Sequence, residues 1–273
     1  MILGFEWSLV LGLLCLGCFG GFLAGLLGIG GGMLMVPFMT MFLSAHGVSG
    51  ALAIKMAIAS SMATILLTSL SSVRAHHRHG AVRWDLVRTL ASGIVSGGLL
   101  SGAGAFALIK GAPLAILFAL FVGFSATRMF LDPQPHPSRE LPGPLGRFSM
   151  GALIGFASGL VGAGGAFISV PFMTRCNVSM HQAVATSAAL GVPIALANTI
   201  GYVIGGWSLH SGLEGSVGYL WLPAIAVIGT ASVLFAPLGA RVAHAMDVRK
   251  LRGVFATLLY LLAAYMIYKA LQG

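Results

Sequence analysis

The chain has 273 residues, of which 58% are hydrophobic and only 8% are charged. Soluble domains carry about 25% charged residues, so this composition excludes a water-soluble globular protein. The formal net charge of +9 would suit a nucleic-acid partner, but the basic residues gather between apolar segments, as they do in the cytoplasmic loops of membrane proteins. We therefore expect a lipid bilayer, and no nucleic acid, as the partner.

The apolar segments follow one another along the chain, and crossing a bilayer takes about 20 apolar residues. They cover roughly residues 4–27, 33–44, 48–73, 89–109 and 113–131 in the first half, and 148–162, 166–175, 178–206, 219–240 and 253–271 in the second. This pattern predicts an all-α, polytopic integral membrane protein with about 8–10 membrane segments. The first residues lack a basic stretch, so no cleaved signal peptide is expected.

One stretch of 20 residues occurs twice in the chain. Residues 21–40, GFLAGLLGIGGGMLMVPFMT, match residues 155–174, GFASGLVGAGGAFISVPFMT, at 12 positions without a gap. A second pair follows, AIASSMA at 57–63 and AVATSAA at 183–189. The sequence therefore predicts one membrane domain of two repeats, residues 1–131 and 148–273, joined by a proline- and glycine-rich cytoplasmic linker over 132–147.

The charges of matched loops indicate that the two repeats have opposite orientations in the membrane. Residues 74–88 are strongly basic, whereas their counterpart 207–218 has no Lys or Arg; the next pair, 110–112 and 241–252, shows the reverse bias. With residues 74–88 inside, all but three of the 15 Lys and Arg lie at inner positions, the exceptions being Lys55, Lys110 and Lys269. Inverted repeats are common among secondary transporters, and the charge pattern predicts a multi-pass protein of the inner membrane.

Each repeated stretch interrupts an apolar helix with glycines, GIGGG at 28–32 and GAGGA at 162–166. The short helix after each break would present unpaired N–H groups and a partial positive charge. Two such N-termini meeting near the middle of the membrane would bind an anion without a buried formal charge, although the glycines could instead only allow close helix packing. The predicted substrate-binding residues at the breaks are Gly28, Gly30, Gly31, Gly32, Met33, Gly162, Gly164, Gly165 and Phe167.

The paired motifs also carry a family resemblance. GLLGIGGGMLMVPF and GLVGAGGAFISVPF, followed by KMAIASSMATILLTSLSSVRAHHRHGAV and HQAVATSAALGVPIALANTIGYVIGG, resemble the TauE/SafE family of membrane permeases over nearly the whole chain. The resemblance implies a transporter of sulfur oxyanions and organosulfonates, such as sulfite or sulfoacetate, usually considered an exporter. The substrate implied is a small anion. The duplication and the loop charges predict that small rocking of one repeat against the other exposes the site alternately to each side of the membrane.

Hydroxyl groups occupy matched positions in the segments that follow the breaks. Ser60 and Ser61 in the first repeat correspond to Thr186 and Ser187 in the second. Their O–H groups could donate to the oxygens of a sulfonate or sulfite. Alternatively, Ser and Thr in membrane helices bond to carbonyls of their own helix or to neighbouring helices.

Three further polar residues lie inside apolar segments and are candidate substrate-binding residues. Lys55 aligns with His181; Lys55 could attract the anion, and His181 could titrate and couple a proton to transport. Lys55 lies near the end of its segment, however, and could simply extend to the membrane surface. Asn198 could line the binding cavity or hold helices together by hydrogen bonds.

Other chemistry receives weaker support. Cys15 and Cys18 form C-x-x-C in an apolar segment, which leaves a membrane thiol-redox protein as one alternative, although small packing residues explain them as well. The histidines of HHRH lie among arginines, which disfavours a metal site. We expect no enzyme activity, no cofactor and no metal. A passive anion channel on the same fold is the other alternative to a transporter. The sequence does not indicate an oligomeric state.

Overall fold

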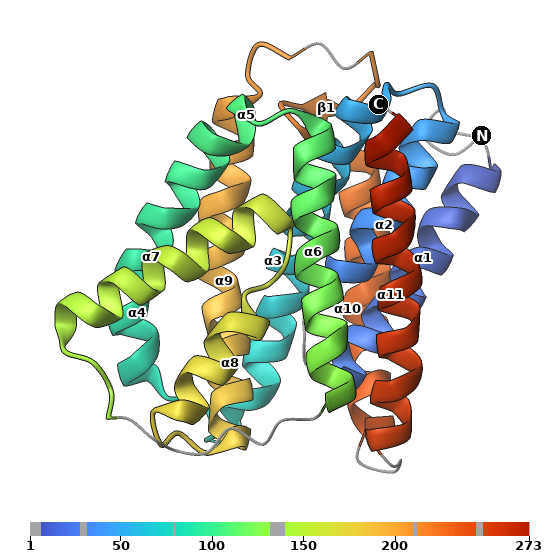
Figure 1. Cartoon of the computed structure of the whole chain (residues 1–273). Coiled ribbons are helices and arrows are strands. Elements are labelled where there is room, and N and C mark those ends of the chain that lie inside the picture. Colours follow the sequence, from blue (N-terminus) through green and yellow to red (C-terminus); the bar gives the residue numbers. More distant parts are fainter. Residues whose placement is uncertain are drawn as a thin grey trace.

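The computed structural model describes residues 7–27, 32–78, 80–131, 140–209, 212–243 and 248–272. These residues form a bundle of helices with one very short β-hairpin (Figure 1). The first half contains α1 (Trp7–Leu27), α2 (Gly32–Ala45), α3 (Gly50–Arg78), α4 (Trp84–Leu99), the π-helix η1 (Leu100–Ala105), α5 (Phe106–Leu108) and α6 (Gly111–Leu131). The second half contains α7 (Pro144–Val161), α8 (Ala166–Arg175), α9 (Met180–Gly205), β1 (Ser216–Val217), β2 (Leu220–Trp221), α10 (Leu222–Ala243) and α11 (Val248–Gln272).

Seven helices in the described part of the chain are long and apolar enough to cross a membrane. They include α3, α6, α7 and α9, and the continuous run formed by α4, η1 and α5. Residues Val10–Leu23 of α1 and the whole of α2 are shorter apolar helices. The prediction of an all-α polytopic membrane protein is confirmed.

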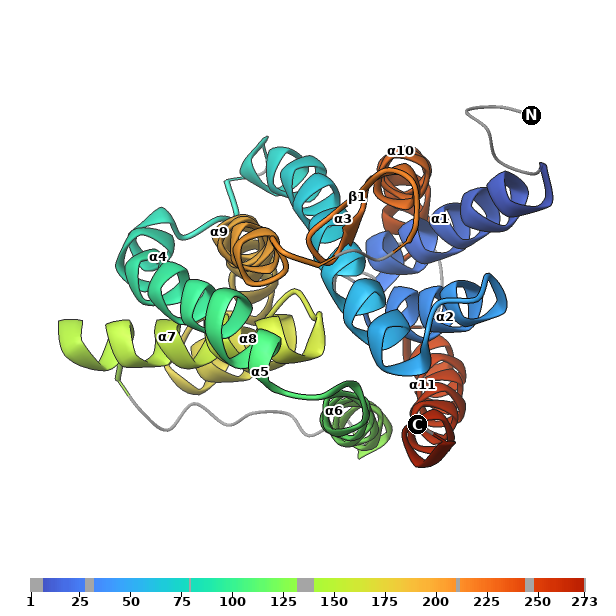
Figure 2. The same ribbon diagram turned by 90° about the horizontal axis from the view of Figure 1, so that it is seen from above.

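Helices at matched positions of the two halves pack in matched ways. The first helix of each half packs against the fourth helical segment of the other half, α1 on α10 and α7 on α4. The third helices, α3 and α9, contact each other at the centre, and the last helices, α6 and α11, pair at one side (Figure 2). In Figure 1, α3 and α6 run downward whereas α9 and α11 run upward. This reciprocal, antiparallel arrangement is what two inverted repeats produce.

Glycines allow the closest of these helix contacts. A Cβ atom added at Gly21 of α1 would lie 2.4 Å from the Cα of Ser232 in α10, and one added at Gly155 of α7 would lie 2.2 Å from the carbonyl oxygen of Ile94 in α4. Gly21 and Gly155 are the matched first residues of the repeated stretch. The glycines before the breaks therefore serve helix packing, as small residues do in membrane bundles.

Some element boundaries differ from the sequence prediction. Helix α3 continues to Arg78 and α4 begins at Trp84, so most of the basic stretch 74–88 is helical. Helix α7 begins at Pro144, which makes the last residues of the predicted linker helical; proline suits the first helical turn because its missing N–H would have no partner there. The π-helix and the β-hairpin have no counterpart in the prediction. The boundaries of the two repeats remain a prediction.

The charged ends of the helices gather at one end of the bundle, which we call the basic end. The ends of α3, α6, α8 and α10 and the starts of α4, α9 and α11 lie there, at the bottom of Figure 1. Basic residues occupy these helix ends, among them Arg74, Arg78, Arg88, Arg128 and Arg175. Lys110 precedes α6 and Lys269 ends α11 at the opposite end.

Candidate functional site

The break between α7 and α8 is a short non-helical connection that glycine makes possible. Gly162 ends α7 with a φ of 70°, and Gly165 precedes α8 with a φ of 76°. Both values lie in the left-handed region, which an L side chain rarely adopts. The break predicted at residues 162–166 is therefore present, and two of its glycines are required by their backbone conformation.

The first turn of α8 presents backbone donors without partners. The N–H groups of Ile168 and Ser169 donate to the carbonyl of Gly165. Within the described chain, the N–H groups of residues 164–167 have no backbone acceptor, and no side chain caps α8. A helix N-terminus with free N–H groups and the positive end of the helix dipole is suited to an anion.

The start of α2 adjoins this break. A Cβ atom added at Gly32 would lie 2.6 Å from the carbonyl oxygen of Gly162 and 2.5 Å from Cδ1 of Ile65. Met33, the next residue of α2, is buried. The start of one short helix thus touches the break that precedes the other. The predicted residues Gly28, Gly30 and Gly31 lie outside the described residues.

Phe167 follows the break on α8, where it is half-buried. Its ring packs edge-on against the ring of Phe121 in α6, with 6.1 Å between the centroids. The side chain of Phe167 therefore covers the side of the break that faces α6.

Two of the predicted hydroxyls, Ser61 and Ser187, lie beside the break. Ser61 is fully buried, and its Oγ has no hydrogen-bond partner among the residues that the structure describes. It lies on α3 between Ile58 and Ile65, at helical spacing, and these two residues approach Gly162 and Gly164 respectively. Ser187 of α9 shares a hydrogen bond of 2.7 Å with Ser169 in the first turn of α8.

Sequence reasoning missed Ser158, a residue of α7 whose hydroxyl lies beside the break. Its Oγ is buried, has no partner, and lies 3.2 Å from the Cβ position at Gly165. The matched position in the first repeat is Ala24, so a search for hydroxyls shared by both repeats could not find Ser158. Its place one turn before the break was the available signal.

The other pair of hydroxyls, Ser60 and Thr186, binds backbone rather than the break. Ser60 Oγ accepts a hydrogen bond of 3.0 Å from the N–H of Trp221. Thr186 Oγ1 accepts one of 3.0 Å from the N–H of Arg83. Both hydroxyls are fully buried. The structure does not bring them together with the anion-facing groups of α8.

Lys55 and His181 occupy matched sequence positions but different surroundings. The ammonium group of Lys55 donates to the carbonyl of Ala107 at 2.9 Å and lies over the rings of Phe106 and Tyr219, 5.8 and 5.3 Å from their centroids. It thereby binds the C-terminal end of α5, where the helix dipole favours a cation. His181 is exposed in the first turn of α9 at the basic end. A role in binding substrate stays a prediction for both.

Asn198 of α9 connects its helix to α7 near the π-helix. Its Nδ2 donates to the carbonyls of Gly155 in α7 and Ile194 in α9, at 3.2 and 2.9 Å. Its Oδ1 is buried without a partner and lies 1.9 Å from the Cβ position at Gly159. These contacts give Asn198 a role in joining α9 to α7; lining of a cavity by Asn198 stays a prediction.

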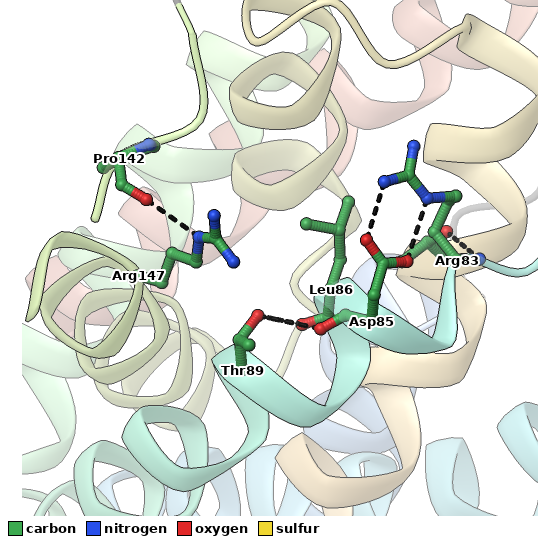
Figure 3. A network of polar contacts seen from close by, with 7 residues as sticks. Arg83, Asp85, Leu86, Thr89, Pro142 and Arg147 are labelled. Atoms are coloured by element: carbon green, nitrogen blue, oxygen red, sulfur yellow. Dashed lines mark hydrogen bonds and ion pairs between the residues drawn. The ribbon is translucent and has the colours of Figure 1, made fainter. Parts of the chain in front are cut away.

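The basic end carries an ion pair beside the start of α4. The guanidinium of Arg83 binds the carboxylate of Asp85 through two hydrogen bonds of 2.9 and 2.6 Å (Figure 3). The hydrogen bond to Asp85 raises the pKa of Arg83 above its ordinary value. Nearby, Nε of Arg147 on α7 donates to the carbonyl of Pro142 (Figure 3). Both arginines thus have fixed partners at this surface.

Comparison with known proteins identifies the family. Residues 13–266 match the family described as "Sulfite exporter TauE/SafE". The chain belongs to the TauE/SafE family. Its members include a "Probable membrane transporter protein" of Haemophilus influenzae, 34% identical over 94% of this chain and 98% of the relative. A probable membrane transporter protein of Methanocaldococcus jannaschii is 26% identical over 97% of this chain and 98% of its own length.

YdhB of Bacillus subtilis, also named a probable membrane transporter protein, is 25% identical over 77% of this chain and 81% of its own length. No solved structure matches the chain. The resemblance to TauE/SafE permeases is confirmed, and the protein is a membrane transporter of this family.

Proposed function

We propose that this TauE/SafE protein is a secondary transporter of the inner membrane that exports sulfur-containing anions, such as sulfite or organosulfonates. The observation that carries the proposal is the first turn of α8. Unpartnered N–H groups, two glycines in left-handed conformations and the unpartnered hydroxyl of Ser158 converge there. N–H and O–H donors suit the oxygens of a sulfonate or sulfite.

The site is surrounded by helices of both halves, which supports transport by alternating access. Ser61 comes from α3, Ser187 from α9 and Ser158 from α7, and Gly32 of α2 touches the break itself. Rocking of one half against the other would open the site first to one side of the membrane and then to the other. By the positive-inside rule, the basic end faces the cytoplasm.

Flux into proteoliposomes tests this proposal. Sulfite, sulfoacetate, thiosulfate and lactate are compared with and without an imposed pH gradient. We expect saturable flux of a sulfur-containing anion, and an effect of the gradient would identify a coupled proton. Unsaturable flux that ignores the gradient would indicate a passive anion channel instead, and no flux of any of these anions would overturn the proposed substrate class.

Two neighbouring glycines provide a matched pair of variants for the same assay. In Gly165→Ala, the new methyl group lies 2.5 Å from Cδ1 of Ile194 and the backbone must hold a φ of 76°, which costs about 1–2 kcal/mol for an L residue. In Gly164→Ala, the nearest atom of the described residues to the methyl group is 3.5 Å away. We expect Gly165→Ala to lose most of the flux and Gly164→Ala to keep it.

The thiol-redox alternative is tested with the cysteines of α1. Cys15 is exposed, Cys18 is partly buried, and both are free thiols. We expect the double variant Cys15→Ala, Cys18→Ala to transport at the unmodified rate. Loss of all activity in that variant would favour the redox alternative.

A further inference from the structure

The matched hydroxyls Ser60 and Thr186 form the same contact twice, each on the opposite half of the chain. Ser60 in α3 of the first half accepts the N–H of Trp221 in the second half. Thr186 in α9 of the second half accepts the N–H of Arg83 in the first half. Both N···O distances are 3.0 Å and both hydroxyls are fully buried.

The two donors occupy equivalent places in the fold. Arg83 directly precedes α4, and Trp221 directly precedes α10. These are the fourth helical segments of the two halves, and each packs against the first helix of the other half. Each hydroxyl therefore binds the residue that directly precedes a helix of the opposite half of the chain.

The two contacts involve opposite ends of the bundle. Helix α4 starts at the basic end, whereas α10 starts at the other end, beside the β-hairpin (Figure 1). We name them the basic-end latch, Thr186 to Arg83, and the opposite-end latch, Ser60 to Trp221.

Charged and aromatic groups reinforce each latch. At the opposite end, Lys55, which lies on α3 with Ser60, binds Ala107 and faces the ring of Tyr219 in the hairpin connection. At the basic end, Asp85 holds the Arg83 side chain (Figure 3). There the indole N–H of Trp84 also donates to Nδ1 of His77, at 3.1 Å.

We propose that Ser60 and Thr186 are positioning residues that close the two sides of the transporter, one side each. Release of the Ser60–Trp221 bond opens the outer side while the basic-end latch stays closed, and release of the Thr186–Arg83 bond opens the cytoplasmic side. The inference rests on the alternating access of the proposed function. It assigns these two hydroxyls to the gates rather than to the anion.

A purely structural role makes a different prediction. If the two hydrogen bonds only stabilised helix starts, removing either hydroxyl would lower stability without favouring one side. If they are latches, removing one hydroxyl shifts the population toward the state open on its own side, and the two variants act in opposite directions. The direction of the shift is therefore the decisive readout.

Gly164 offers a reporter at the break, because the nearest atom of the described residues to a Cβ there is Cγ2 of Ile65, at an ordinary 3.5 Å. The native Cys15, Cys18 and Cys176 are first replaced by alanine, and Gly164→Cys is then introduced. The purified protein is reconstituted in proteoliposomes of known orientation, and a membrane-impermeant maleimide is applied from each side in turn. The labelling rates report how often the break is open to that side.

We expect Ser60→Ala to raise the outer-to-cytoplasmic ratio of labelling rates about fivefold, and Thr186→Ala to lower it by a similar factor. A factor of five is what one hydrogen bond of about 1 kcal/mol contributes to an equilibrium. The exchanges Ser60→Thr and Thr186→Ser keep a hydroxyl and should leave the ratio unchanged. Thr64→Ala is the matched control, because Thr64 donates only within α3, to the carbonyl of Ser60.

Lys55→Met is a second variant that tests the opposite-end latch if Ser60→Ala folds poorly. It should shift the ratio of labelling rates in the same direction as Ser60→Ala. Ratios that stay constant, or that move in the same direction in both hydroxyl variants, overturn the latches. If the unmodified reporter shows substrate-dependent labelling from both sides in that case, alternating access stands without them. If the reporter is labelled from one side under every condition, alternating access fails and the latches fail with it.

Discussion

At the scale of single residues, this transporter relies on buried hydroxyls rather than buried charges. Ser61 and Ser158 are buried without a hydrogen-bond partner among the described residues; Ser158 lies beside Gly165 of the break, and Ser61 lies between two residues of α3 that approach the break. An unpartnered polar group inside a protein costs about 1–3 kcal/mol, so such groups persist where they meet a ligand or water. The hydroxyls of Ser60 and Thr186 have backbone partners instead, which separates two roles within one sequence motif.

Replacement of Ser158 by alanine tests the first role. Because Ser158 Oγ has no hydrogen-bond partner in the part of the chain that the structure describes, Ser158→Ala should leave the melting temperature nearly unchanged. It should raise the KM for the transported anion about fivefold, the effect of one hydrogen bond of about 1 kcal/mol. Ser149→Ala, on the exposed face of the same helix, is the control. An unchanged KM in Ser158→Ala would remove this hydroxyl from the site.

Replacement of Lys55 should lower stability whereas replacement of His181 should not, although the two residues occupy matched positions in the repeats. Lys55→Met loses a charged hydrogen bond to Ala107 and two ring contacts, so it should destabilise the protein by about 1–2 kcal/mol. His181→Ala removes an exposed side chain and should change neither stability nor flux. Thermal unfolding in detergent and flux measurements check both variants. A loss of pH-dependent flux in His181→Ala would instead support the coupling proton predicted from the sequence.

At the scale of elements, the sequence predicts features that arise from neighbouring residues, such as the glycine breaks. It does not predict hydrogen bonds between residues that lie far apart in the chain. The glycine breaks follow from residues adjacent in the chain, and the predicted position of the second break agrees with the structure. The bonds from Ser60 and Thr186 join residues 161 and 103 positions apart. A hydroxyl that binds an anion and one that binds a backbone N–H look alike in sequence, so no local pattern separates them.

The π-helix η1 illustrates the same limit. Its sequence, LSGAGA, is apolar and continues the run of α4, so periodicity predicts an ordinary helix. Its small residues pack against α9, where a Cβ atom at Gly102 would lie 2.8 Å from the carbonyl oxygen of Asn198. The change of helix type thus coincides with the close contact to α9.

The close packing of α7 on α4 predicts that a larger side chain at Gly155 destabilises the bundle. In Gly155→Leu, the new side chain would start 2.2 Å from the carbonyl oxygen of Ile94, so the two backbones must separate. Overpacking of this kind costs about 1–3 kcal/mol, and we expect a lower melting temperature and less folded protein on size-exclusion chromatography. Gly123→Leu on α6 is the control, because nothing lies within 4 Å of its Cβ position. Equal stability of the two variants would contradict the close contact.

At the scale of the whole molecule, two features independent of each other support inverted repeats. One is the charge of the loops, read from the sequence alone. The other is the reciprocal packing of α1 on α10 and α7 on α4, together with the opposite directions of α3 and α9. A single binding site shared by two oppositely oriented halves gives both sides of the membrane equivalent routes to it.

Orientation in the membrane is the last prediction, and it follows from the basic end. Arg78 ends α3 there, whereas Trp207 follows α9 at the opposite end and is 77% exposed. In a protein without native cysteines, Arg78→Cys should react with an impermeant maleimide only from the cytoplasm, and Trp207→Cys only from outside. Basic residues favour the cytoplasmic side during insertion. Labelling of both positions from one side would contradict the bundle's direction across the membrane, whereas the reverse assignment would place the basic end outside.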